Sequence, residues 1–265
     1  MKDSGIEEYQ LDAWYLLEYV TGISKASYYG DPNRELSAAQ AEEYRKCIEK
    51  RSERIPLQHI TGVQEFMGHE FFVNEHVLIP RQDTEILVEH ALDKVEDGKK
   101  VLDMCTGSGC ILLSILKRYQ VQGTGADISS EALQVAERNR KHLALPQVEW
   151  LQSDLFEKIE EKYDVIVSNP PYIQTGVIES LQEEVRLHDP YIALDGKEDG
   201  LYFYRRIIED AKAYLEDGGW LLFEIGYDQA EPVTRLMEQA GYSEIHVKKD
   251  LSGLDRVAGA RYNKN

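Results

Sequence analysis

Cysteine is scarce in this chain of 265 residues. Cys47, Cys105 and Cys110 include no Cys-x-x-Cys pair, so their spacing predicts neither a disulfide framework nor a zinc site and fits a reducing cytoplasm. Long apolar runs are also missing and the first residues are acidic, so we expect no membrane-spanning helix and no secretion signal. The histidines show no ligand spacing, so we expect no metal.

Positively charged residues are also few. The chain has 30 Lys and Arg against 48 Asp and Glu, a formal charge of −18, and no basic run beyond Lys248-Lys249. Binding to duplex nucleic acid needs clustered cations, so we expect no direct nucleic-acid partner, whereas a basic protein partner is compatible. The length favours one large domain beside a smaller one, and we expect a monomer.

The first 58 residues predict a small helical domain. Apolar residues recur at helical spacing from Ile6 to Val20, a short helix is expected over 24–29, and Ser37 with Gln40 forms a capping-box pattern before another helix. We expect its aromatic residues to be core rather than docking surface; if they are exposed, this domain selects the substrate. They are Tyr9, Trp14, Tyr15, Tyr28 and Tyr29.

Residues 59–82 predict a linker made of a β-hairpin or two. Short β-rich runs, the first of them Gln58–Gly62, are separated at Gly68 and Asn74-Glu75. A helix should follow, capped by Asp83 or Thr84 and closed by Gly98. The rest, 83–265, predicts an α/β domain.

A βαβ series begins at the apolar strand 100–104. The turn that follows it, Cys105-Thr106-Gly107-Ser108-Gly109, leads into a helix expected over 111–119. Small residues at a helix N-terminus allow a ligand to approach the backbone closely. A dinucleotide fingerprint would require glycine at Cys105 and at Leu112, so the pattern disfavours NAD.

Acidic residues follow the next two strands. Asp127 ends the strand 123–127, where a carboxylate can hold the hydroxyl pair of a ribose, and the next helix begins at Ser130. Asp154 and Leu155 follow the strand 148–152 at the same edge of the sheet. Together with the glycine turn, these positions predict a nucleoside site. A helix N-cap is the alternative reading of Asp154.

The fourth strand, 164–168, is followed by Asn169-Pro170-Pro171-Tyr172. Each proline fixes its own φ and restricts the residue before it, so this loop is stiff. It has few backbone N–H donors, and it presents the Asn169 side-chain oxygen and the Pro170 carbonyl beside the aromatic Tyr172. A planar NH2 group fits two acceptors and a ring face. The alternative is a strand-ending turn with a surface tyrosine.

Beyond this loop the pattern completes a seven-stranded sheet. We expect a helix from Leu201 closed by Gly218-Gly219, a strand over 220–225, and a helix opened by Asp228 with Glu231 as a capping box and closed by Gly241. Two final strands, 243–247 and 256–262, suggest a terminal hairpin. The loop after the fourth strand then lies beside the point where strand order reverses.

These motifs, taken in order, resemble those of Class I S-adenosylmethionine-dependent methyltransferases, and specifically the HemK/PrmC family. That family methylates the glutamine of the Gly-Gly-Gln motif in class I peptide-chain release factors. The resembling segments are 56–62, 79–85, 102–109, 127–129, 169–172, 193–196 and 199–200.

The resemblance implies a Rossmann-like sheet, S-adenosyl-L-methionine as cofactor with S-adenosyl-L-homocysteine as product, and a release factor as partner. It also implies two groups of site residues. The residues that it implies bind the cofactor are Cys105, Thr106, Gly107, Ser108, Gly109, Asp127, Asp154, Leu155 and Asn169. The residues that it implies bind the substrate amide are Asn169, Pro170, Pro171 and Tyr172. Of these, Asn169, Pro170 and Tyr172 are the implied catalytic residues.

Two residues depart from the family pattern, and three others match it without an assigned role. Gln82 stands where the family usually has proline, and Cys105 stands where glycine is common. Arg81, Thr84 and Glu85 match a family motif whose role the sequence does not indicate.

The implied chemistry is an in-line methyl transfer to an amide nitrogen, catalysed by positioning and electrostatics without an early general base. Two alternatives stay open. An adenine amino group of a nucleic acid is also planar and able to stack on Tyr172, although the acidic composition disfavours it. The fold could also bind a cofactor or a protein without turnover.

Overall fold

The structure is a computed structural model that describes residues 1–31 and 33–264. The chain divides into two compact units. Unit 1 comprises Met1–Val63 and Gln182–His188, and unit 2 comprises Gln64–Leu181 and Asp189–Asn265. A short segment from the middle of the sequence therefore packs with the N-terminal residues.

Unit 1 is built from helices. Their bounds are η1 Lys2–Ser4, α1 Tyr9–Thr21, α2 Lys25–Gly30, α3 Ala38–Ser52, α4 Leu57–Thr61 and α9 Glu183–His188. The expected capping box is confirmed, because the Ser37 side chain accepts from the Gln40 N–H and the Gln40 side chain accepts from the Ser37 N–H. Helix α4 corrects the β-rich expectation for Gln58–Gly62: the fixed φ of Pro56 starts a helical turn, and Gly62 ends it at φ 77°.

The expectation that the N-terminal aromatic residues form the core is wrong. Tyr29 is 78% exposed, Tyr15 is 45% exposed, and neither Tyr9 nor Trp14 is buried. Aliphatic side chains such as Leu16 fill the space between α1 and α3 instead. A helix pair this small has room for few large rings, so most aromatic surface stays outside.

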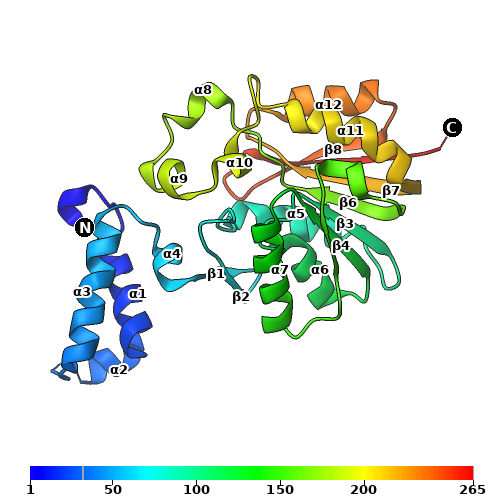
Figure 1. Cartoon of the computed structure of the whole chain (residues 1–265). Coiled ribbons are helices and arrows are strands. Elements are labelled where there is room, and N and C mark those ends of the chain that lie inside the picture. Colours follow the sequence, from blue (N-terminus) through cyan, green and yellow to red (C-terminus); the bar gives the residue numbers. More distant parts are fainter. Residues whose placement is uncertain (32, 265) are drawn as a thin grey trace. The chain divides into compact units, whose positions relative to one another are not determined.

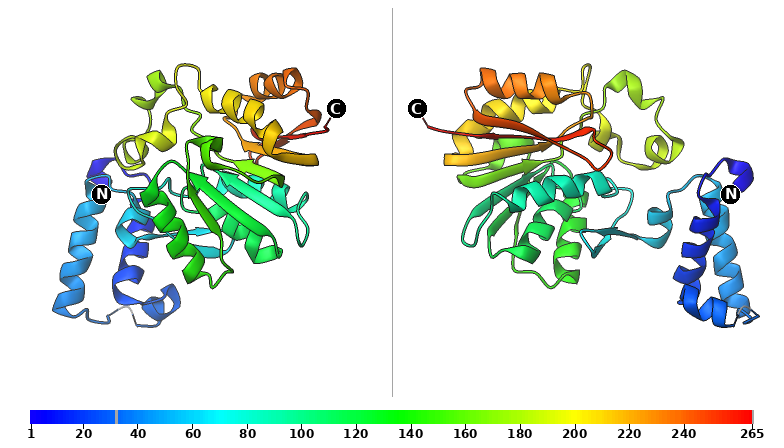
Figure 2. Two further views of the ribbon diagram at one scale, coloured as in Figure 1. Left: turned by 45° about the vertical axis from the view of Figure 1, so that its right-hand side comes forward. Right: turned by 180° about the vertical axis from the view of Figure 1, so that it is seen from behind.

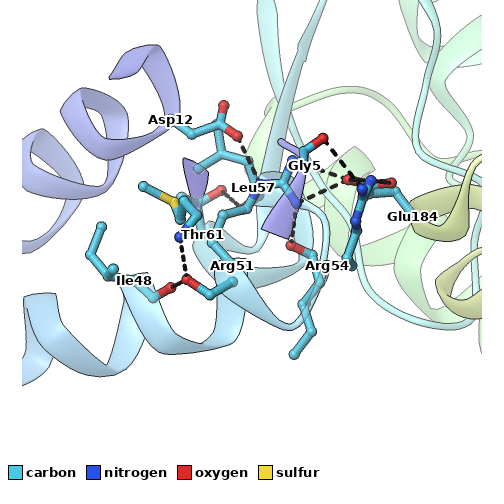
Figure 3. A network of polar contacts seen from close by, with 11 residues as sticks. Gly5, Asp12, Ile48, Arg51, Arg54, Leu57, Thr61 and Glu184 are labelled. Atoms are coloured by element: carbon cyan, nitrogen blue, oxygen red, sulfur yellow. Dashed lines mark hydrogen bonds and ion pairs between the residues drawn. The ribbon is translucent and has the colours of Figure 1, made fainter. Parts of the chain in front are cut away.

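A buried ion-pair network joins α9 to the rest of unit 1 (Figure 3). The Arg51 Nε donates to Asp12 Oδ2 at 2.8 Å, and both residues are only 8% exposed. The Arg51 guanidinium also donates to Glu184 Oε1 at 3.3 Å, and Arg54 Nη1 donates to both Glu184 oxygens at 3.1 and 3.0 Å. Although burial raises the pKa of Glu184, hydrogen bonds with both arginines leave that pKa below its usual value.

Unit 2 is organised around a seven-stranded sheet (Figure 1). Its strands are β3 Lys100–Met104, β4 Gln122–Asp127, β5 Glu149–Gln152, β6 Tyr163–Ser168, β7 Leu215–Glu224, β8 Ser243–Lys249 and β9 Asp255–Arg261. The order is β5-β4-β3-β6-β7-β9-β8, in which only the pairs made by β9 are antiparallel. Strand order reverses between β3 and β6, as expected.

Helices cover both faces of this sheet (Figure 2). The covering helices are α5 Gln82–Leu92, α6 Cys110–Arg118, α7 Ser130–His142, α11 Tyr202–Tyr214 and α12 Ala230–Gln239. The short helices α8 Thr175–Ile178, α10 Tyr191–Leu194 and η2 Leu155–Lys158 lie in the connecting segments. Alternate residues of the buried strands point to opposite cores. Val101 packs with α5 and α6, while its neighbour Leu102 packs with α11 and α12.

A single hairpin precedes α5. It consists of β1 Val63–Phe66 and β2 His69–Phe72, joined through Met67 and Gly68, both at positive φ. The further run His76–Ile79 forms no strand.

Four expected boundaries, in three helices, are wrong. Helix α5 begins after Arg81 without a side-chain cap and ends at Leu92, well before Gly98. Helix α12 likewise has no capping box from Asp228, since Gln229 occupies its N-cap. Gly218-Gly219 does not close α11, because the chain passes directly from Tyr214 into β7 and both glycines lie within that strand.

Candidate active site

A cleft lies at the carboxyl ends of β3, β4 and β6 in unit 2. The empty space within it is about 1010 Å³, open solvent included. Most of the predicted cofactor residues line it, together with Asn169 and Pro171: they are Cys105, Thr106, Gly107, Ser108, Asp127, Asp154 and Leu155. Gly109, Pro170 and Tyr172 are not among the lining residues.

The turn between β3 and α6 is held in a left-handed conformation. Cys105, Gly107 and Gly109 have φ of 60°, 54° and 78°. A Cβ on Gly107 would meet no atom within 4 Å, so its backbone borders the open space of the cleft. On Gly109 a Cβ would lie about 3.2 Å from Leu113 and Trp150, which makes that glycine a packing requirement.

Asp103, which the sequence reasoning did not single out, fixes this turn from below. It is fully buried at the end of β3, and its Oδ2 accepts from Thr106 Oγ1 at 2.6 Å and from the Leu112 N–H at 3.3 Å. Burial raises the pKa of Asp103 to about 7, although both hydrogen bonds oppose that rise. The sequence marks Asp103 only as an acidic residue within an apolar strand, just before the glycine turn.

Asp127 lies where its carboxylate both builds the turn and faces the cleft. Its Oδ2 accepts from the Gly107 N–H and its Oδ1 from the Ser129 N–H, each at 2.9 Å. Each carboxylate oxygen retains acceptor capacity beyond these bonds. Burial raises the pKa of Asp127, and the backbone hydrogen bonds counter that effect.

Asp154 has a different environment. Its Oδ1 accepts from Arg206 Nη1 at 3.0 Å, and its side chain makes no N-cap hydrogen bond to η2. The residues present fit a nucleoside cofactor on two grounds: an open backbone at Gly107 and a carboxylate at Asp127 that lines the same cleft.

The loop after β6 is anchored at both of its ends. Ser168 Oγ donates to the Met104 carbonyl at 2.7 Å, which ties the end of β6 to β3. The Tyr172 hydroxyl donates to Glu224 Oε1 at 3.2 Å, and its ring packs against the core beneath α11. The ring therefore stands behind the loop, and Asn169 is the polar side chain that the loop turns toward the cleft.

Segment 193–200 supports this loop from behind and explains two motifs that the sequence left without a role. The Gly196 N–H donates to the Ile173 carbonyl at 2.7 Å, and Gln229 Nε2 donates to the Tyr172 carbonyl at 3.0 Å. A Cβ on Gly196 or on Gly200 would lie 2.7 or 2.4 Å from the Tyr172 backbone. Only glycine permits this approach.

The motif at the start of α5 also acquires structural roles. Arg81 Nη2 donates to the buried Asp189 Oδ2 at 2.6 Å, which ties the start of α5 to the segment before α10. Glu85 Oε1 accepts from the Met67 N–H at 2.5 Å and holds the hairpin turn. Thr84 lies beside Asn169, whose Nδ2 is 3.5 Å from Thr84 Oγ1. Among the described residues, no group of three or more His, Cys, Asp or Glu could hold a metal ion.

Comparison with known proteins gives consistent findings. A family model described as the PrmC N-terminal domain matches residues 1–62, and one described as the methyltransferase small domain matches residues 81–186. The release factor glutamine methyltransferase of Geobacter sulfurreducens is 40% identical over 264 residues, which cover 98% of this chain and 92% of that protein. A protein of the same description from Clostridium acetobutylicum is 42% identical over 264 residues, with 97% and 93% covered.

One solved structure shows the fold alone. A methyltransferase from Pyrococcus furiosus matches with a TM-score of 0.58 at 18% identity, over 86% of this chain and 100% of its own. The two chains therefore share the fold of this seven-stranded sheet.

Proposed function

The chain belongs to the release factor glutamine methyltransferase family, and we propose on that premise that it methylates a glutamine side-chain amide in class I release factors. The target is the glutamine of their Gly-Gly-Gln motif, and the methyl donor is S-adenosyl-L-methionine. Such a substrate acts in translation, so the proposal includes a cytoplasmic location and an effect on termination.

One observation carries this proposal: the glycine turn, Asp127 and Asn169 border the same cleft at the strand-order reversal. Asp127 would hold the ribose hydroxyls and Gly107 would pass close to the amino-acid portion of the cofactor. The bound cofactor supplies an electrophilic methyl group on a sulfonium centre.

The loop after β6 provides the acceptors. An amide nitrogen is a poor nucleophile, because its lone pair is delocalised into the carbonyl. Asn169 Oδ1 and the Pro170 carbonyl would each accept one hydrogen of the substrate NH2, which aims the nitrogen toward the cofactor. Tyr172 and Pro171 keep these two acceptors in place. The proton that the nitrogen gives up can pass to water.

We assign protein docking to residues 1–58, with 59–82 as the linker and 83–265 as the catalytic domain. The exposed aromatic residues of unit 1 support that assignment, since Tyr and Trp are enriched in protein interfaces. The formal charge of −18 favours a basic protein partner over nucleic acid, and we propose a monomeric enzyme. Among the described residues no helix is long and apolar enough to cross a membrane.

Transfer of labelled methyl tests the proposal. The protein is incubated with labelled S-adenosyl-L-methionine and a purified class I release factor, beside a Gln→Ala variant of its Gly-Gly-Gln motif and unmethylated DNA and RNA. Label in the wild-type factor alone is expected. Label in nucleic acid alone would overturn the proposal in favour of adenine methylation, and no label in any substrate would leave a binding protein.

The cofactor assignment has its own test. Asp127→Ala should weaken S-adenosyl-L-methionine binding at least about tenfold in calorimetry, because a charge-assisted ribose contact is lost. Asp154→Ala is the matched comparison, because it also removes a carboxylate that lines the cleft, but one that already pairs with Arg206. Unchanged affinity in Asp127→Ala would contradict the ribose assignment.

A further inference from the structure

Asn139 on α7 is a fully buried polar residue that the mechanism above does not use. A buried amide is costly unless it is hydrogen-bonded, so its partners indicate what it does. Its Nδ2 donates to the Ser108 carbonyl at 2.9 Å and to the Phe72 carbonyl at 3.1 Å, and its Oδ1 accepts from the Phe72 N–H at 2.6 Å. One side chain thus joins the turn after β3 to strand β2 of the hairpin, against which α7 lies (Figure 1).

These three hydrogen bonds permit one orientation of the Asn139 amide. Both hydrogens on Nδ2 go to carbonyls, and a flipped amide would set its oxygen against those two carbonyls. Aspartate at this position would have no N–H to donate when ionised, and glutamine is one methylene longer in a site with no exposed surface. Position 139 is therefore suited to asparagine among the polar side chains of this size.

The turn after β3 has three side-chain anchors. Asp103 and Asp127 hold the two residues before Ser108, and Asn139 holds Ser108 itself. The turn includes left-handed backbone at Cys105, which is costly for a residue with a Cβ, so the anchors preset its conformation. A backbone that is already ordered binds a ligand at a lower entropic cost. Of the three anchors, Asn139 is the one that also bonds to the hairpin.

The hairpin depends on the same amide. Strands β1 and β2 have four residues each, and a two-stranded hairpin is marginally stable by itself. Phe71 is buried in the core, whereas Phe72 is bound to α7 through Asn139 and through Arg138, whose guanidinium carbon lies 3.6 Å from the ring centre. Because Phe71 keeps β2 attached, loss of the Asn139 amide should loosen β2 locally at Phe72.

We propose that Asn139 is a positioning residue that couples cofactor binding at the turn after β3 to the order of the hairpin. A cofactor that contacts the turn stabilises the Ser108 backbone, and through Asn139 it also stabilises Phe72 in β2. Such coupling is reciprocal, so an ordered hairpin favours the cofactor. The hairpin begins at Val63, where the sequence passes from unit 1 to unit 2, so the linker responds to the cofactor. The inference rests on the proposed function for the identity of that cofactor.

Cofactor affinity tests the positioning role. Calorimetry with S-adenosyl-L-homocysteine uses the full-length protein and needs no turnover. Asn139→Ala leaves the Ser108 carbonyl without this donor, and the Kd should rise about tenfold. Tyr242→Phe is the matched control, because it removes a buried hydrogen bond to the Ile208 carbonyl outside the cleft and should leave the Kd unchanged. Equal affinity of Asn139→Ala and wild type, or an equal rise in both variants, would overturn the positioning role.

Amide exchange measured by nuclear magnetic resonance tests the coupling, and the wild-type protein alone decides it if Asn139→Ala does not fold. In wild type, S-adenosyl-L-homocysteine should slow exchange of the Phe72 amide about fivefold, the lower end of usual coupling between sites. The Ser252 amide, which donates to Asp250 Oδ1 in the turn after β8, is the control and should not respond. In Asn139→Ala the Phe72 amide should stop responding, while the Gly107 amide in the turn still responds.

The outcomes separate this inference from the proposed function. A Phe72 amide that does not respond in ligand-bound wild type would overturn the coupling, and a response that persists in Asn139→Ala would overturn the role of this side chain. If wild type binds no S-adenosyl-L-homocysteine, the proposed function and the coupling both fail. If wild type binds it but transfers no methyl group to a release factor, the proposed function fails and the Phe72 amide still decides the coupling.

Discussion

Asn169 has a neutral amide, which makes it an orienting group and a poor base. In the mechanism proposed above it would orient the substrate, and its Nδ2 lies 3.5 Å from the Oγ1 of the buried Thr84. A general base would need a group within reach that titrates near neutrality. Asp103, whose pKa is about 7, is committed to Thr106 and the start of α6 and does not line the cleft.

Removing the Asn169 amide should therefore affect the rate more than binding. We expect Asn169→Ala to lower kcat roughly 10²–10³-fold, the usual loss when one preorganised hydrogen-bonding group is removed from a reaction site. Steady-state kinetics with a release factor measures this. A rate close to wild type would refute catalysis by this acceptor.

At the residue scale, the sequence predicted the location of polar side chains that directly follow an apolar strand, whereas their roles stay a proposal. Asp127 and Asn169 are of this kind, and both line the cleft. The sequence did not predict the contacts of Thr84 and Glu224, which are 85 and 52 positions from their partners in the loop. Such pairs form only when β6, β7 and α5 pack together, so no local pattern marks them.

At the scale of elements, caps were predictable only where no tertiary partner competes. Ser37 and Gln40 are exposed and cap α3 as expected. Asp83 and Glu85 stand in the first turn of α5, yet Asp83 pairs with Arg256 and Glu85 holds Met67. Their side chains serve contacts with distant strands, and the helix begins uncapped.

Gly200 tests how closely one loop supports another. Gly200→Ala would place a Cβ 2.4 Å from the Tyr172 carbonyl oxygen at a φ of 72°. We expect at least about 2 kcal/mol of lost stability from left-handed strain and overlap, with a parallel loss of methyl transfer. Thermal unfolding and kinetics measure both. Gly176→Ala is the control, because its Cβ would meet nothing within 4 Å. Equal behaviour of the two variants would contradict the supporting role.

The ion-pair network of unit 1 makes a second prediction about an element. Glu184→Ala removes the acceptor shared by Arg51 and Arg54, leaving Arg51 with Asp12 and the Ile55 carbonyl. Hydrogen exchange in 182–188 should accelerate roughly tenfold or more, as a charged hydrogen bond contributes about 1.5–3 kcal/mol. Glu183, whose side chain is 53% exposed, provides the control Glu183→Ala, for which little change is expected. Similar exchange in both variants would show that α9 is held by other contacts.

At the scale of the whole molecule, the doubly covered sheet followed from the order of strands and helices in the sequence. Apolar runs such as 164–168 can only be buried on two faces, and the Asn169 loop had to fall at the strand-order reversal. The assignment of α9 to unit 1 could not be predicted, because it depends on the buried Arg51 and the half-buried Arg54 meeting Glu184 from a segment distant in the sequence.

Global stability should depend on a histidine pair in unit 2, of which His90 is buried and His246 is half-buried. His90 on α5 is 5% exposed, and its Nε2 lies 2.5 Å from the His246 Nε2 on β8, a contact that requires one ring nitrogen to be unprotonated. Burial lowers the pKa of His90 to about 4, assisted by His246, Lys248 and Lys94 and opposed by Asp93.

The sign of the pH dependence follows from this pKa. The unfolded chain binds the His90 proton below about pH 6.5, whereas the folded chain binds it only near pH 4. The unfolded state thus holds more protons in this window, and the free energy of unfolding falls as pH decreases from 6.5 to 4, by about 3 kcal/mol at most. Urea unfolding of His90→Gln should show a flatter slope across these pH values, while His76→Gln, at an exposed histidine, should run parallel to wild type. Parallel curves for both variants would show that carboxylates alone set the acid sensitivity.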